Sequence, residues 1–225
     1  MGGQTNEYDR WRSIDYRPVL PELPSEPLAP YLHSGQRALE IGCNRGRTAL
    51  WLASRGVEIV GIDINSEAIL HAREQAKKLS NIKARFIEGD FLNEPDTGTF
   101  DLIVMIRVLT CFSRVEDWRA LLNRCFDCLT GEGLMYIHDF VMAPQCESYR
   151  ERYREGARRG WQIGNFAVPG REGGMPFIAH HHSIEEITEI ANPYQSMFLN
   201  FHDSVSLNGN ACRMFEFLGK RRGTA

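Results

Sequence analysis

The sequence lacks any long apolar run. No stretch approaches the roughly 18 consecutive apolar residues that a membrane-spanning helix requires. Its first residues are polar rather than signal-like, so the sequence predicts a soluble, cytoplasmic protein with no membrane partner. An excess of charge of one sign is also missing, since the net charge is −3 and the isoelectric point is about 6.2. We therefore expect no nucleic-acid partner, because overall electrostatic attraction to phosphates is absent.

A disulfide framework is absent as well. The six cysteines are scattered, several of them among apolar neighbours, which indicates buried thiols and a reducing compartment. Cys125 and Cys128 form a C-x-x-C pair, but apolar residues recur around them at helical spacing. The pair is therefore predicted to belong to the buried face of a helix rather than to a redox or zinc site.

The length of 225 residues, with 43% apolar composition, suits the core of one domain but is short for two. We expect that domain over residues 37–225, preceded by an N-terminal arm over 1–36 and carrying a lid insertion at about 143–182. The insertion holds many arginines with interleaved glutamates and ends in three consecutive histidines. Glutamates and arginines four residues apart are typical of a solvated helix face.

The N-terminal arm is rich in proline and carries several aromatic residues. Prolines at every third position from Pro18 to Pro30 predict an extended, polyproline-like path across a surface. A helix at about 5–13 would present Tyr8 and Trp11. These aromatic side chains either close over a ligand or anchor the arm to the core.

Residues 37–140 alternate between short apolar runs and amphipathic segments. Strands are expected at 39–41, 57–62, 84–87, 101–106 and 134–137. Helices are expected between them, at 48–55, from 66 onward, and at 116–129 with an end marked by Gly131 and Gly133. Strands that alternate with helices or crossovers predict an α/β fold, with a doubly wound, mostly parallel sheet and helices on both faces.

The last third of the chain carries three further signals. Ser183 and Glu186 form a capping box, which predicts a helix over about 184–191. Two final strands, at 196–205 and 211–218, are separated by an Asn-Gly-Asn hairpin signal. The sequence therefore predicts seven strands in total, the last two antiparallel.

The stretch 37–50 indicates a short strand, a turn and the start of a helix. Gly42 and Gly46 would let the backbone approach a ligand closely, and the helix N-terminus presents free N–H groups. Asp63 ends the next apolar run, where a ribose hydroxyl would find an acceptor. Together these features predict a nucleotide-type site at the carboxyl ends of the strands. Further polar residues at or near those ends are Glu40, Asp90, Arg107 and His138.

With these motifs the sequence resembles the class I S-adenosylmethionine-dependent methyltransferases, by motif over about residues 37–140 and by layout beyond them. The resemblance implies S-adenosylmethionine as the cofactor, with the glycine turn receiving its amino acid end. The first motif would supply contacts from Glu40, Gly42, Cys43, Asn44 and Gly46. The final hairpin is similar to the family's antiparallel sixth and seventh strands.

The resemblance also implies the remaining cofactor contacts. Asp63 would bind the ribose hydroxyls, and Ile64 would lie against the adenine. Asp90 would take the adenine amino group, with Phe91 beside it, in a stretch similar to the third motif. Arg107, just after the strand similar to the fourth motif, completes the predicted set.

Two features depart from the family pattern. Asn44 replaces the usual middle glycine of the turn, and Thr110 and Cys111 stand where many relatives have acidic or histidine residues. The spacing also argues against an NAD-dependent oxidoreductase, because Gly42 and Gly46 do not form G-x-G-x-x-G. A non-catalytic module that binds S-adenosylmethionine remains the other alternative.

Methyl transfer is an in-line displacement on a sulfonium, so the enzyme mainly positions the acceptor and excludes water. We expect a small-molecule or peptide acceptor, with a carboxylate or hydroxyl oxygen ahead of nitrogen. A carboxylate needs no base but needs a cationic clamp, which Arg107 could supply, or else Arg150, Arg152 or Arg154 of the insertion. A hydroxyl or amine needs a base, for which His138 and His180 are the candidates.

In an extended segment His180 and His182 would share a face, away from His181. We therefore predict a hydrogen-bonded, structural His181. A metal site would need further ligands that the sequence does not place, so none is predicted. The predicted substrate contacts are Tyr8, Trp11, Tyr149, Arg150 and His182.

Overall fold

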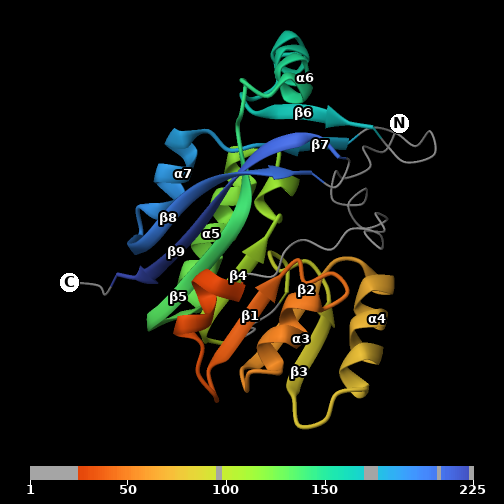
Figure 1. Cartoon of the computed structure of the whole chain (residues 1–225), viewed down its shortest axis with the longest axis vertical. Helices are drawn as coiled ribbons and strands as arrows, with labels where there is room; N and C mark the ends of the chain where they lie inside the picture. The colour runs from red at the N-terminus through yellow and green to blue at the C-terminus, as the bar shows by residue number, and fades with distance from the viewer. Residues whose placement is uncertain (1–24, 95–97, 170–176, 207–208, 223–225) are drawn as a thin grey trace.

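The central element of the structure is a seven-stranded sheet (Figure 1). The computed structural model describes residues 25–94, 98–169, 177–206 and 209–222. The strand order is β3-β2-β1-β4-β5-β9-β8. The bounds are β1 Arg37–Ile41, β2 Glu58–Asp63, β3 Lys83–Glu88, β4 Phe100–Ile106, β5 Leu129–Val141, β8 Tyr194–Val205 and β9 Ala211–Arg221. The first five strands pair in parallel, and β9 pairs antiparallel with β5 and β8, which confirms the predicted sheet and hairpin.

Helices cover both faces of the sheet, as predicted (Figure 1). They are α3 Arg47–Ala53, α4 Ser66–Lys77, α5 Val115–Cys128 and α7 Ile184–Ala191. Successive residues of β4 point to opposite faces. Leu102 and Val104 belong to the core shared with α3 and α4, whereas Ile103 and Met105 belong to the core shared with α5 and α7. All four are fully buried, which explains why this central strand is apolar throughout.

The polyproline-like path predicted for the arm is wrong for residues 25–31. These residues form α2 (Ser25–Leu28) and a 3-10 turn, η1 (Ala29–Tyr31). Pro30 lies in the first turn of η1, where the missing N–H removes no hydrogen bond. Leu28 is fully buried in the core shared with α3 and α4, so apolar burial stabilises the compact path. The helix expected at about 5–13 lies outside the described residues.

The fifth strand is longer than predicted. It begins at Leu129, directly after α5, so Gly131 and Gly133 lie within β5 rather than in a turn before it. The pairing with β4 is irregular there, because Phe100 pairs with Leu129 but Leu102 pairs with Leu134. Gly131 and Gly133 therefore mark a stretch of β5 that has more residues than the facing part of β4, as in a β-bulge.

The insertion after β5 forms a helix and a small second sheet. These elements are α6 (Glu147–Arg158), β6 (Asn165–Val168) and β7 (Phe177–His180), with β6 and β7 antiparallel. Figure 1 shows them at the end of the main sheet toward which β4 and β5 run. Ion pairs of Glu151 and Glu155 with neighbouring arginines confirm that α6 presents a charged, exposed face. The capping box at Ser183 is also confirmed, and α7 begins directly after it.

All six cysteines are free thiols, as predicted. Cys125 is completely buried in α5, and Cys128 is partly buried beside the same core. In the part of the chain that the structure describes, no helix has the length and apolar character needed to cross a membrane.

Candidate functional site

The turn between β1 and α3 has an unusual backbone. Gly42, Asn44 and Gly46 all have positive φ angles, of 68°, 47° and 78°. The backbone N–H groups of Gly42 and Cys43 donate to the carbonyl of Ile62 in β2, at 2.8 and 3.0 Å. A positive φ is unfavourable for a residue with a side chain, but in Asn44 a local hydrogen bond offsets part of this cost. Its side-chain oxygen accepts from the N–H of Arg45 at 2.7 Å. Asparagine thus replaces the usual glycine here without changing the turn.

The two glycines of the turn also lie in close contact with neighbouring elements. A Cβ at Gly42 would come within 2.6 Å of the Val108 side chain, in the segment that follows β4. A Cβ at Gly46 would come within 2.9 Å of both Ala72 in α4 and the Phe86 ring in β3. Any side chain here would displace its neighbours, so glycine is required for packing as well as for φ.

Asp63 connects this turn to the end of β2. One carboxylate oxygen accepts from the N–H of Asn44 and the other from the N–H of Asn65, each at 2.8 Å. Burial raises the pKa of Asp63, while these two hydrogen bonds act in the opposite direction. A carboxylate has about four lone-pair sites, so each oxygen retains capacity for a ligand hydroxyl. Ile64 follows it, half-buried.

Glu40, at the end of β1, is a buried acid with an unsatisfied oxygen. Only 4% of the residue is exposed. Burial raises its pKa to about 8, and the hydroxyl of Thr48 and the N–H of Ala49 partly oppose this through hydrogen bonds. Within the described residues, the Oε2 atom has no hydrogen-bond partner. The acid is therefore mostly protonated near pH 7, and a cationic or N–H group of a ligand at this oxygen would favour its ionised form.

Cys43, Asp90 and Phe91 all have contacts within the protein, at the positions predicted for cofactor contacts. The Cys43 thiol is buried, which raises its pKa, so this side chain is part of the core. Asp90 accepts from the N–H of Leu92 at 3.0 Å, which shapes the loop after β3. The Phe91 ring is buried in the core, with the guanidinium of Arg124 over it at 4.7 Å. The Phe91 ring is therefore part of the core.

Arg107 directly follows β4 and has a left-handed conformation, with φ 56°. Its N–H donates to the carbonyl of His138 at 2.8 Å. Its guanidinium lies over the Phe140 ring at 5.4 Å and 3.8 Å from the Met214 sulfur. The side chain thus extends toward β5 and β9. The side chain therefore places a cation beside the end of β5, and the cofactor contact predicted for Arg107 stays a prediction.

His138 forms a pair with His202 of β8. Their Nε2 atoms are 3.3 Å apart, so one nitrogen donates and the other accepts. Burial, followed by the neighbouring His202 and Arg107, lowers the pKa of His138 to about 4. The imidazole is therefore neutral near pH 7, and a pKa this far below neutrality makes it a weak base in the absence of a ligand.

Asp139 was not singled out from the sequence, but it shapes the same region. It is completely buried, and its carboxylate accepts from the N–H groups of Leu109 and Thr110 at 2.8 and 3.4 Å. These residues belong to the 3-10 turn η2 (Leu109–Cys111), directly after Arg107 and Val108. Burial raises its pKa to about 6 despite these hydrogen bonds. In the sequence, only the position of this acid just after the strand expected at 134–137 could have indicated the role, and in the structure Asp139 lies within β5.

The predicted substrate contacts of the insertion are mostly engaged in packing. Tyr149 is buried among aromatic rings, 5.3 Å from Phe166 and 4.7 Å from His181 between ring centroids. His181 stacks on Phe140 and bonds to the Tyr153 hydroxyl at 2.7 Å, which confirms its predicted structural role. Arg150 donates to carbonyls of the loop before its own helix. Tyr8 and Trp11 lie outside the described residues.

His180 and His182 share a face, as predicted, but that face is closed. Both are completely buried. His180 bonds to Asn165 and Glu186, and burial lowers the pKa of His182 to about 3. A side chain without solvent access is poorly placed to take a proton from a diffusing acceptor. The structure therefore argues against the predicted base role of His180 and the predicted substrate contact of His182.

Comparison with known proteins gives the following relatives. Residues 38–133 match a family described as "Methyltransferase domain". The chain is 30% identical over 116 residues to a ubiquinone biosynthesis O-methyltransferase of Psychrobacter cryohalolentis, which covers 50% of this chain and 44% of that protein. The match thus spans less than half the length of that relative.

Solved structures show the same fold. A structure described as a SAM-dependent methyltransferase from Methanosarcina mazei has a TM-score of 0.82 and 25% identity, over 90% of this chain and all of that one. The N-methyltransferase NodS from Bradyrhizobium japonicum, in complex with S-adenosylhomocysteine, has a TM-score of 0.62 and 18% identity. That likeness covers 95% of this chain and 96% of NodS.

The packing around Gly46 leads to a stability prediction. Gly46→Ala introduces both a strained positive φ and a Cβ 2.9 Å from Ala72 and Phe86. Gly35→Ala is a matched control, because Gly35 has φ 83° but no atom within 4 Å of the added Cβ. In chemical denaturation we expect Gly35→Ala to lose about 1 kcal/mol and Gly46→Ala about 1–3 kcal/mol more. Equal losses would show that the contact is unimportant.

The His138 pKa leads to a pH prediction. Because the folded pKa of about 4 is below the ordinary histidine value of 6.5, the folded state binds fewer protons between these values. The stabilisation is complete above pH 6.5 and is lost as the pH falls toward 4. Relative to His138→Gln, wild-type unfolding free energy should fall by up to about 3 kcal/mol across this range. A difference that does not change with pH contradicts the prediction.

Proposed function

We propose that this chain, which belongs to the class I S-adenosylmethionine-dependent methyltransferase family, methylates an oxygen or nitrogen of a small molecule or peptide. S-adenosylmethionine would supply an activated methyl group on a sulfonium, which the acceptor displaces in line. The chain's own residues then have three tasks. They bind the cofactor, orient the acceptor and, where the acceptor carries a proton, remove it.

The observation that carries the proposal is the joined turn of Gly42–Gly46 and Asp63. The turn is closely packed and presents its backbone at the carboxyl end of β1, while Asp63 retains acceptor capacity for ribose hydroxyls. The unsatisfied Oε2 of buried Glu40 supports this assignment, since the cationic amino group of the cofactor would supply its missing partner. Ile64 and the backbone at Asp90–Phe91 are left for the adenine.

The acceptor side is assigned to the ends of β4 and β5. Val108 contacts the glycine turn directly, so the segment that begins at Arg107 lies beside the cofactor turn. Arg107 would hold an acceptor carboxylate through bidentate hydrogen bonds. Neutral His138, whose carbonyl accepts from the Arg107 N–H, is the base candidate for a hydroxyl or amine. The name of the O-methyltransferase relative supports oxygen, and that of NodS keeps nitrogen within the proposal.

The six free thiols support a cytoplasmic location for this activity. A reducing compartment keeps such thiols unpaired. Fractionation of the source cells, with detection of the protein by antibody, would test the location.

The role of Asp63 is tested by Asp63→Asn. Removing the charge should weaken S-adenosylhomocysteine binding by about 10- to 100-fold, as expected for the loss of a charged hydrogen bond. Glu74→Gln is the matched control, because it removes the same charge from an exposed position on the neighbouring helix α4. Titration calorimetry measures both, and thermal unfolding shows whether Asp63→Asn stays folded. Unchanged affinity in a folded Asp63→Asn variant would exclude the assigned site.

The acceptor class is tested with methyl-labelled S-adenosylmethionine. The protein is incubated with separate small-molecule, peptide and RNA fractions of a cell extract, and the labelled product is tested for the alkali lability of an ester. We expect label in the small-molecule or peptide fraction. Label only in RNA would overturn the acceptor class, and cofactor binding without transfer to any fraction would indicate a non-catalytic module.

Two variants then separate the acceptor chemistries. For a carboxylate acceptor, Arg107→Gln should lower kcat/KM about 10- to 100-fold while His138→Gln has little effect. For a hydroxyl or amine acceptor, His138→Gln should lower kcat, measured at saturating acceptor, about 100-fold or more. Unchanged activity in both variants would remove both residues from the acceptor site.

A further inference from the structure

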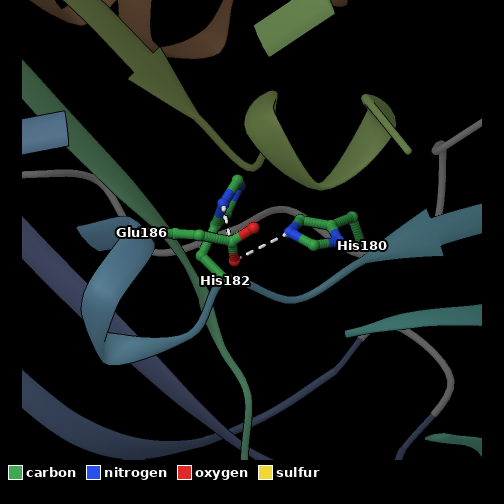
Figure 2. A group of neighbouring side chains, drawn as sticks. All are labelled: His180, His182 and Glu186. Carbon is green, nitrogen blue, oxygen red and sulfur yellow. Dashed lines mark hydrogen bonds and ion pairs between the residues drawn. The ribbon is translucent and has the colours of Figure 1, made fainter. Parts of the chain in front are cut away.

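A buried cluster of two histidines and a glutamate lies where the insertion rejoins the domain (Figure 2). His180 ends β7, His182 follows it, and Glu186 lies in the first turn of α7. One donor atom from each lies within 4.8 Å of the other two. Both histidines are completely buried, and the Glu186 side chain is 17% exposed. The cluster is separate from the proposed cofactor turn and has no part in the methyl-transfer proposal.

The hydrogen bonds of Asn165 determine the tautomer of His180. The Asn165 amide nitrogen donates to the carbonyl of Ser113 at 2.8 Å, so its oxygen faces the Nδ1 of His180 at 2.7 Å. Nδ1 must therefore carry the hydrogen. In the neutral ring, the lone pair of Nε2 then faces the Oε2 of Glu186 at 3.1 Å. Two acceptors face each other, so a proton or a metal ion is needed between them.

His182 presents a second nitrogen to the same oxygen. Its Nδ1 is 3.9 Å from Glu186 Oε2, and Figure 2 shows the two histidines approaching this carboxylate from different directions. The Leu109 backbone interacts with the His182 ring and favours its protonated form, but within the described residues Nδ1 has no hydrogen-bond partner, and Glu186 Oε2 faces it. Leaving a buried polar group unsatisfied is costly, and a single proton shared by His180 and Glu186 does nothing for His182. A cation bound to all three side chains would supply the missing partner of His182 Nδ1.

The other contacts of Glu186 keep it ionised and in place. Its Oε2 also accepts from the N–H of Ser183 at 2.8 Å, and its Oε1 accepts from the Gln162 amide at 2.9 Å. Both partners are donors, so they favour the carboxylate form and leave a lone pair of Oε2 for a cation. The capping box that begins α7 thus supplies the third ligand, which the sequence alone did not place.

We propose that His180 Nε2, His182 Nδ1 and Glu186 Oε2 bind one divalent transition-metal ion, with Zn²⁺ the best match to the donor set. Two imidazole nitrogens and a carboxylate are a known zinc donor set, and the Asn165 contact resembles the outer hydrogen bond that orients metal-bound histidines. Ligand atoms of a tetrahedral zinc ion lie roughly 3.4 Å apart, so the present spacing needs shifts of about 1 Å. A water molecule would complete the four ligands.

The site would stabilise the attachment of the insertion to β5. The backbone of His182 pairs with the end of β5, through His182 N to Phe140 O at 3.2 Å and Met142 N to His182 O at 2.7 Å. The metal would join this segment to α7, and through Asn165 to β6. Because the histidines are closed to solvent, the proposed ion has a structural role and takes no part in methyl transfer.

The test uses the full chain purified without chelators, incubated with Zn²⁺ and then desalted. Elemental analysis should find one zinc ion per chain, and Co²⁺ in its place should give visible ligand-field absorption. His182→Ala should lose the bound metal. His181→Ala is the matched control, because the neighbouring ring faces the aromatic cluster instead, and it should retain one zinc ion per chain.

Wild-type protein provides a test that does not depend on variant folding. A chelator should lower the Tm, and Zn²⁺ but not Mg²⁺ should restore it. Three results would overturn the proposal: no stoichiometric zinc in wild type, equal zinc in wild type and a folded His182→Ala variant, or a Tm that does not respond to chelator and Zn²⁺. Such results would leave a proton shared by His180 and Glu186. They would not affect the methyltransferase proposal, because S-adenosylhomocysteine binding is measured separately.

Discussion

The candidate site depends on the carboxylate of Asp63. This one side chain accepts a hydrogen bond from the backbone on each side of it, at Asn44 and at Asn65, and so joins the turn after β1 to the turn after β2. Burial of the charge opposes ionisation, and the two N–H donors offset that effect. The left-handed turn, the start of α3 and the start of α4 are all positioned around this connection. A ligand hydroxyl would bind to an acceptor that is already oriented, which reduces the ordering that binding requires.

A second buried carboxylate, that of Asp139, has the same architectural role one strand pair away. It accepts from the first N–H groups of η2 and thereby determines the path of the chain after Arg107. The result is a short segment that contacts the glycine turn through Val108 and presents Arg107 toward β5. The two acids together place the glycine turn next to the segment that begins at Arg107, which are the proposed cofactor and acceptor sides.

The histidines of this protein differ in role because their surroundings differ. His138 pairs with His202 beside the Arg107 cation, where a neutral ring is favoured. His181 lies in an aromatic cluster that connects α6 and β6 to the end of β5. His180 and His182 face the opposite way, toward Glu186. Alternation along an extended segment separates neighbouring rings onto two faces, and the packing on each face then decides what each ring does.

Local patterns in the sequence determined the strands, most helix bounds and the capping box at Ser183. They also determined the positions of Gly42, Gly46 and Asp63. All of these depend on contacts within a few residues and on apolar periodicity. Only the tertiary structure decided where side chains point. It buried the Phe91 ring, directed Arg150 to its own loop, closed His180 from solvent and placed Glu186 beside two histidines. It also made residues 25–31 helical through the burial of Leu28. These outcomes depend on contacts between segments far apart in the chain, which no local pattern encodes.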